Sequence, residues 1–311
     1  MIPYSLRLYV KIKIANLAGV TKHCLCLLKD LVSPPTKRSC PARVGVMTCT
    51  LNEASCIAFT VGALVDQVDL YVLIDTGSTD GTEELVRSLY SRQIAEKKLI
   101  VEQMGPLQDY DISIARNRAV EILQEHNVDY FVKVDGDDVF YDEGASHLVK
   151  EIRHSPLELK SYYVRSHELY QWSLARTPEW LQALGEKRQV FWRMNFSPAQ
   201  TRVGRVDGAR ASGRWTDEAR GMSPEGVGSE LPGLSRGSWR ICAAHYGWAK
   251  PVELKEEKIR IWNEQGQGDP RVDTLHLVRD GRKPLRLFTQ HPEVIERKID
   301  QVLAFFESRG E

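Results

Sequence analysis

Four short apolar runs, separated by longer amphipathic stretches, organise the chain between residues 43 and 135. The apolar runs are rich in branched side chains and predict four strands: VGVMTC, DLYVLID, KLIVEQM and DYFVKVD. The first three are followed by segments with helical spacing: NEASCIAFTVGALVDQ, EELVRSLYSRQIAEK and SIARNRAVEILQEHN. Strands that alternate with helices of this length form βαβ units. We therefore expect a parallel α/β sheet whose strand ends share one edge.

The pattern changes after residue 150. The aromatic and branched segments SYYVRSHELYQW and KRQVFWRMN predict antiparallel strands. Residues 203–238 are rich in glycine, arginine and acidic residues with little periodicity, so we expect a long loop there. PVELKEEKIRIWNEQG and PEVIERKIDQVLAFFE predict two helices near the end of the chain. We therefore place boundaries near residues 43 and 150.

Charge distinguishes residues 1–42 from the rest of the chain, because they carry seven basic side chains and one acidic one. They form a basic extension that is disordered, lies on an anionic membrane surface, or results from a start codon upstream of the real one. Over all 311 residues the 42 basic side chains equal the 42 acidic ones, so no global field favours nucleic acid. No apolar run reaches the roughly 18 residues that would span a bilayer. We expect a cytoplasmic protein, with peripheral contact at the inner face of the membrane through residues 1–42 as an alternative.

An acidic turn follows the fourth predicted strand and contains Asp135, Asp137 and Asp138. Carboxylates this close repel one another unless a cation joins them. Their hard oxygens suit Mg²⁺ or Mn²⁺, and Gly136 allows the backbone to turn. Two alternatives remain open at this point. The turn is simply solvated, or the Asp-x-Asp-x-Val run is the nucleophile motif of a haloacid-dehalogenase-type phosphatase, with Asp135 as the nucleophile.

Four segments together favour a different family. VGVMTCTLNEASCI, VLIDTGSTDGTEELV, SIARNRAVE and YFVKVDGDD, in this order, resemble the nucleotide-sugar domain of family 2 glycosyltransferases with the GT-A fold. The phosphatase hypothesis predicts neither the DTGSTDGT turn nor the ARN element. The resemblance implies a GT-A fold of the α/β class: a Rossmann-like, mostly parallel sheet flanked by helices, with a smaller mixed acceptor-side subregion. Residues 43–150 would then bind the nucleotide-sugar and residues 151–311 the acceptor.

The resemblance also implies roles for individual residues. The nucleotide would be bound by residues at the strand ends and on the third helix: Thr50, Asn52 and Glu53 around the base, Asp75 hydrogen-bonded to it, and Arg116 at the nucleotide or its diphosphate. Asp135 would contact the ribose or the metal with its water shell, and Asp137 would bind the metal directly. Asp138 would assist it or cap the turn. His245, in the HYGW element, would be a further metal ligand or a phosphate donor.

The implied activity is metal-dependent, inverting glycosyl transfer, with Mn²⁺ or Mg²⁺ as cofactor. The donor would be a nucleoside-diphosphate sugar and the acceptor a hydroxyl of a saccharide, a lipid-linked molecule or a protein. Inversion needs a general base, for which Asp217 and Glu218 in GRWTDEARG are the candidates. The alternatives are a non-catalytic nucleotide-sugar-binding module and, as above, a phosphatase using Asp135.

Overall fold

The computed structural model describes residues 39–108, 111–155, 159–173, 193–196, 200–206, 234–251, 256, 260 and 291–310. Several predicted features lie outside these residues: nearly all of the basic extension, most of the helix predicted after residue 251, and residues 207–233 of the predicted loop. Within the described part of the chain, no helix combines the length and the apolar character needed to cross a membrane.

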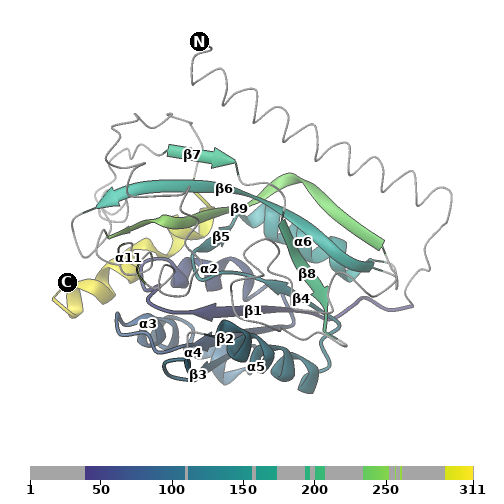
Figure 1. The fold of residues 1–311 in the computed structure, drawn as a ribbon, viewed down its shortest axis with the longest axis horizontal. Coiled ribbons are helices and arrows are strands. Elements are labelled where there is room, and N and C mark those ends of the chain that lie inside the picture. The colour runs from purple at the N-terminus through teal and green to yellow at the C-terminus, as the bar shows by residue number, and fades with distance from the viewer. Residues whose placement is uncertain are drawn as a thin grey trace, which may run out of the picture.

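The first half of the sheet is parallel, as predicted (Figure 1). Its strands follow the order β3-β2-β1-β4 and comprise β1 (Val44–Thr50), β2 (Leu70–Asp75), β3 (Leu99–Gln103) and β4 (Tyr130–Lys133). Every residue of β2 and β4 is buried. This is the pattern of strands covered by helices on both faces of a sheet.

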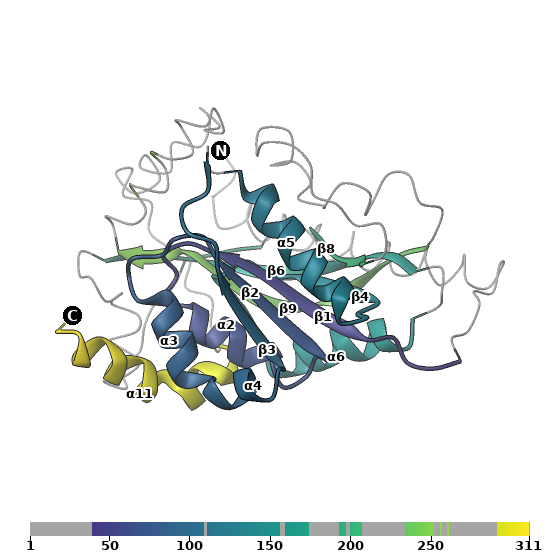
Figure 2. The ribbon, with the colours of Figure 1, turned by 90° about the horizontal axis from the view of Figure 1, so that it is seen from below.

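Helices cover both faces of this sheet (Figure 2). They are α2 (Ile57–Leu64), α3 (Thr82–Leu89), α4 (Ser91–Ala95), α5 (Ile112–Glu125), α6 (Asp142–Arg153) and α11 (Glu293–Ser308). Helix α5 lies on one face, whereas α2, α3, α6 and α11 lie on the other. Two separate hydrophobic cores result, one around Phe59 and the other around Leu123.

Two helix predictions need correction. The helix predicted from residue 52 begins only at Ile57, because the preceding residues form a turn in which Asn52 has a positive φ of 54°. The helix predicted over residues 83–97 is interrupted at Tyr90, whose φ and ψ are −121° and 27°. The buried Tyr90 hydroxyl donates a hydrogen bond to the Ala58 carbonyl, so contact with α2 is associated with the break.

The second half of the sheet is mixed. It contains β5 (Asp138–Phe140), β6 (Leu159–Ser173), β7 (Arg193–Phe196), β8 (Gln200–Arg205) and β9 (Leu234–Pro251). Strand β8 continues the sheet beside β4, giving the order β3-β2-β1-β4-β8-β6-β9-β5, with β7 paired to β6. As predicted, β6 runs antiparallel to β7. It also runs antiparallel to β8, a strand that the sequence pattern did not predict. The fold class inferred from the sequence is therefore confirmed.

This second half also differs from the prediction in three respects. The first residues of the loop predicted over residues 203–238 belong to β8, and its last residues belong to β9. The parallel pairing of β6 with β9 was not predicted. The three-residue strand β5 was not predicted, because a strand this short is identified by its pairing with β9 rather than by its own pattern.

Candidate active site

Hydrogen bonds join the loops that follow β1 and β2 into one unit. The Asn52 amide N–H donates to Ser78 Oγ and its side-chain Oδ1 accepts from the Thr79 N–H, both at 2.9 Å. The Glu53 N–H donates to Thr82 Oγ1, also at 2.9 Å. The Asn52 side chain, which was predicted to line the base pocket, therefore joins the loops after β1 and β2. These hydrogen bonds hold the two loops in place without a ligand.

At the ends of β1 and β2, two buried oxygens lack a hydrogen-bond donor among the described residues. Thr50 and Asp75 are register partners. Asp75 Oδ1 accepts from the backbone N–H groups of Gly77 and Ser78, at 2.9 and 2.7 Å. Asp75 Oδ2 and Thr50 Oγ1 have no such partner. A buried acceptor without a donor is costly, so a ligand that supplies N–H or O–H groups would relieve both atoms.

Two cationic side chains lie near this edge of the sheet. Arg116 is buried in the first half of α5, and Lys133 is buried at the end of β4. Lys133 Nζ lies 3.5 Å from Asp135 Oδ1, which makes Asp135 the counter-charge of this buried amine. Burial raises the pKa of the nearby Cys49 thiol to about 11. Arg116 opposes this rise in the pKa, Asp135 adds to it and Lys133 opposes it, so the charges of all three residues act on the thiol.

The acidic turn lies directly against the end of β1. Thr60 Oγ1, on α2, donates a hydrogen bond of 2.9 Å to the Gly136 carbonyl. A Cβ on Gly136 would lie 2.8 Å from Glu53 Cγ and 3.0 Å from Thr50 Oγ1. Only glycine therefore permits this close approach. As a result, the residues predicted to bind the base and those predicted to bind the metal belong to one site.

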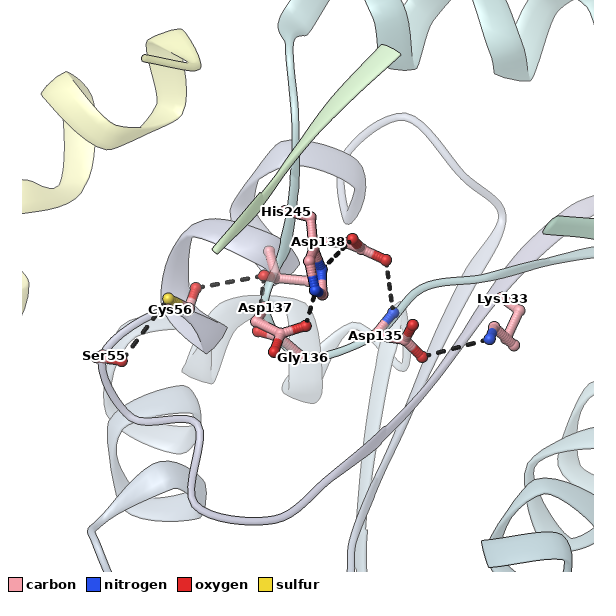
Figure 3. Close-up of polar contacts among 9 residues, drawn as sticks. Ser55, Cys56, Lys133, Asp135, Gly136, Asp137, Asp138 and His245 are labelled. Carbon is pink, nitrogen blue, oxygen red and sulfur yellow. Dashed lines mark hydrogen bonds and ion pairs between the residues drawn. The ribbon is translucent and has the colours of Figure 1, made fainter. Parts of the chain in front are cut away.

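Three side chains converge at the start of β5 (Figure 3). His245 Nδ1 lies 2.9 Å from Asp138 Oδ1 and 3.3 Å from Asp137 Oδ1. Each of the three residues offers one ligand atom, and these atoms lie within 4.8 Å of one another. Both carboxylates are only 2% exposed. A Cβ on Gly247 would come within 2.9 Å of the His245 ring and 3.2 Å of Asp137 Oδ2, so a larger residue here would displace these side chains.

This donor set fits a divalent cation. Carboxylate oxygens are the preferred ligands of Mg²⁺, and a site that adds an imidazole also suits Mn²⁺. Two adjacent buried carboxylates repel each other, and a cation between them would remove that repulsion. Asp137, Asp138 and His245 would therefore hold such an ion.

Two of the three members of this cluster are among the metal ligands predicted from the sequence. Asp137 and His245, both predicted as ligands, do come together, whereas Asp138 was treated only as an accessory or capping residue. Asp135, predicted as a metal or ribose contact, lies beside Lys133 and outside the three-residue cluster. The pairing of β5 with β9, which sets Asp138 opposite His245, would have revealed the third member of the cluster. Asp217 and Glu218 lie outside the described residues.

The sequence model of the family described as "Glycosyl transferase family 2" matches residues 45–210, more than half of the chain. The chain belongs to glycosyl transferase family 2. The resemblance seen in the four motifs is thereby confirmed, and the protein is a glycosyltransferase of this family. The match includes the acidic turn of this glycosyltransferase but ends before His245, the third member of the cluster.

Comparison with solved structures gives distant similarities. A Staphylococcus aureus TarS structure (residues 1–349, in complex with UDP) is 18% identical, with a TM-score of 0.28. The match covers 43% of this glycosyltransferase and 37% of that chain, so it spans well under half of that protein. Glucosyl-3-phosphoglycerate synthase from Mycobacterium tuberculosis, in complex with Mn²⁺, UDP and phosphoglyceric acid, is 16% identical, with a TM-score of 0.39. That match covers 74% of this chain and 80% of the synthase. Among curated proteins none matches the chain.

Proposed function

We propose that this enzyme transfers a sugar from a nucleoside-diphosphate sugar to an acceptor hydroxyl, with inversion at the anomeric carbon and with Mn²⁺ or Mg²⁺ as cofactor. One observation carries the proposal: Asp137, Asp138 and His245 bring three ligand atoms within 4.8 Å of one another. They do so beside the ends of the parallel strands, which is the edge where sheets of this class bind their ligands.

The ends of β1 and β2 would receive the nucleobase. Asp75 Oδ2 and Thr50 Oγ1 are buried acceptors without a donor among the described residues, and a base offers N–H groups. Arg116 and Lys133 supply positive charge on the same side of the sheet, near Asp135. A planar guanidinium suits the oxygens of a diphosphate. Asp135, neutralised by Lys133, would accept a hydrogen bond from a ribose hydroxyl.

The cluster would serve the departure of the nucleoside diphosphate. A divalent cation bound there would neutralise the charge that develops on the leaving group. Asp137 and Asp138 would hold it through their oxygens and His245 through a ring nitrogen. Because the loops after β1 and β2 are already joined by hydrogen bonds, they would orient the nucleotide with little rearrangement.

Inversion also requires a base on the face opposite the leaving group, which removes the proton from the acceptor hydroxyl. We propose Asp217 or Glu218 for this role, on the grounds of their carboxylates and their place in the acceptor half of the sequence. The acceptor would be a saccharide, a lipid-linked molecule or a protein.

A thermal-shift screen tests the proposal directly. The purified enzyme is heated with UDP-, GDP-, CMP- and dTDP-sugars, each with and without Mn²⁺. A ligand that binds only the folded state raises the melting temperature. We expect one nucleotide class to raise it clearly with Mn²⁺ and much less after chelation. Equal shifts with and without the ion would contradict the metal role, and no shift with any nucleotide-sugar would contradict the donor class.

A further inference from the structure

A tyrosine beside the proposed metal ligand His245 is joined to the C-terminal part of the chain. Tyr246 is fully buried, and its hydroxyl lies 2.5 Å from Nδ1 of His291, just before α11. The two rings are also stacked, with centroids 5.9 Å apart and an angle of 21° between their planes. A hydrogen bond and a ring contact together restrict the orientation of both side chains.

The same tyrosine contacts the acidic turn through its backbone. The Tyr246 N–H donates a hydrogen bond of 2.8 Å to the Asp137 carbonyl oxygen. Tyr246 therefore directly follows one proposed metal ligand, His245, in the chain, and its backbone is hydrogen-bonded to another, Asp137. Any displacement of this residue along β9 would change the separation between His245 and Asp137.

Helix α11 is itself attached to the start of α6 and to the core beside α2. Arg297 makes two hydrogen bonds to the Asp142 carboxylate, at 2.5 and 2.9 Å, and Glu293 Oε2 accepts from the Asp142 N–H at 3.0 Å. Asp142 begins α6, two residues after β5 ends. Ile295 is buried in the hydrophobic core that includes α2. The helix is therefore attached to the elements that follow and support the acidic turn.

We propose that Tyr246 and His291 are positioning residues of the metal centre, and that α11 belongs functionally to that centre. Their hydrogen bond sets the distance between His245 on β9 and the Asp137–Asp138 turn. This inference rests on the proposed metal-dependent function. It assigns a role to a part of the chain that lies beyond the family match, which ends at residue 210.

The simpler explanation is that the hydrogen bond only satisfies a buried hydroxyl and contributes to stability. The two explanations differ in their effect on metal affinity. Removing a residue that orients a metal ligand typically costs about 10- to 100-fold in affinity or activity. A purely stabilising hydrogen bond would change the melting temperature and leave the affinity for the metal unchanged.

Mn²⁺ binding, followed by electron paramagnetic resonance of the free ion, provides the test. Full-length wild type is compared with Tyr246→Phe, His291→Phe and His291→Asn. Tyr90→Phe is the matched control, because it also removes a buried tyrosine hydroxyl, one that donates to the Ala58 carbonyl on α2. We expect the Kd for Mn²⁺ to rise about 10-fold or more in the two phenylalanine variants at residues 246 and 291. His291→Asn, which can again hydrogen-bond the phenol, should recover part of the affinity, and Tyr90→Phe should bind Mn²⁺ as wild type does.

The possible results separate this inference from the proposed function. If wild type binds Mn²⁺ and Tyr246→Phe and His291→Phe bind it equally well, the positioning role is wrong while the metal centre stands. If wild type does not bind Mn²⁺, both the metal centre and the positioning role are wrong. Should His291→Phe not fold, Tyr246→Phe and His291→Asn still decide the question, because each keeps the packing largely intact.

Discussion

Asp137 and Asp138 are consecutive residues whose side chains are both almost completely buried. The Nδ1 atom of His245 lies within 3.3 Å of both carboxylates. In the absence of a cation, their mutual repulsion lowers the stability of the fold. Functional sites commonly carry such a cost, because the arrangement that binds a ligand is rarely the most stable one without it. At the scale of single residues, this trade-off can be measured.

Asp137→Asn should abolish Mn²⁺ binding and lower transfer by about 100-fold or more, because it removes a charged ligand. The melting temperature without metal should stay the same or rise, since one of two neighbouring buried charges is gone. Asp129→Asn is the control, because Asp129 accepts from the Arg43 N–H at the opposite edge of the sheet. Full transfer by Asp137→Asn under strict chelation would reject the metal role.

Asp75→Asn tests the base pocket. The amide can keep the hydrogen bonds that Oδ1 accepts from Gly77 and Ser78, but the second oxygen is replaced by an N–H donor. Losing a hydrogen bond to a charged acceptor costs about 1.5–3 kcal/mol, so the KM for the donor should rise about 10-fold or more. Unchanged donor affinity would show that Asp75 does not contact the nucleotide.

The general base is tested by Asp217→Asn and Glu218→Gln, examined separately. The variant that loses the base should show a turnover lower by about 100-fold or more, with the nucleotide-sugar Kd unchanged. Steady-state rates and thermal-shift titrations of the donor measure the two quantities independently. If neither variant loses turnover, the base lies elsewhere in the chain.

At the scale of elements, close backbone approach connects α6 to β9. A Cβ on Gly144 would lie 2.5 Å from the Cys242 carbonyl oxygen and 2.7 Å from its Cα. Because these atoms belong to the backbone of β9, they cannot move aside as a flexible side chain would. The position of α6 therefore restrains the strand that carries His245.

Gly144→Ala should consequently lower the free energy of unfolding by about 1–3 kcal/mol, the usual cost of overpacking. It should also weaken Mn²⁺ binding, because β9 must shift to accommodate the methyl group. Chemical denaturation and Mn²⁺ titration measure the two effects. Ser146→Ala, at an exposed position of the same helix, should change neither by much. A fully stable Gly144→Ala variant would contradict this account of the packing.

At the scale of the whole molecule, one sheet runs from β3 to β5 and joins the two halves distinguished in the sequence. The C-terminal helix α11 lies on the same face as α2 and α3 (Figure 2) and packs into their core. Burial lowers the pKa of His291, which precedes this helix, to about 4. The stability of the whole fold therefore depends on the protonation of this side chain.

The sign of the dependence follows from proton binding. Between about pH 4 and pH 6.5 the unfolded chain protonates His291 more than the folded chain does, so the free energy of unfolding falls as the pH is lowered through this window. The contribution is at most about 3 kcal/mol. Urea denaturation at pH 7 and pH 4.5 should show a smaller fall for His291→Phe than for wild type. Equal falls in the two proteins would contradict a buried, neutral His291.

Local patterns were sufficient for the parallel strands of the first half of the fold. The buried strand β2 has an apolar run that needs no partner to be recognised, and the DTGSTDGT turn ends it at Asp75. Two of the missed features depend on partners distant in the chain. The break at Tyr90 accompanies a contact with α2, and the parallel pairing of β6 with β9 depends on how two separate segments align.

The sequence by itself determined the family, the parallel sheet and the location of an acidic turn at a strand end. Each of these follows from patterns within short, continuous segments of the chain. Only the tertiary structure decided which carboxylates and which histidine form the cluster. Asp138 and His245 are 107 residues apart and meet through the register of β5 on β9. Such a register arises from the packing of the entire sheet, and a shift of one residue would turn His245 to the opposite face.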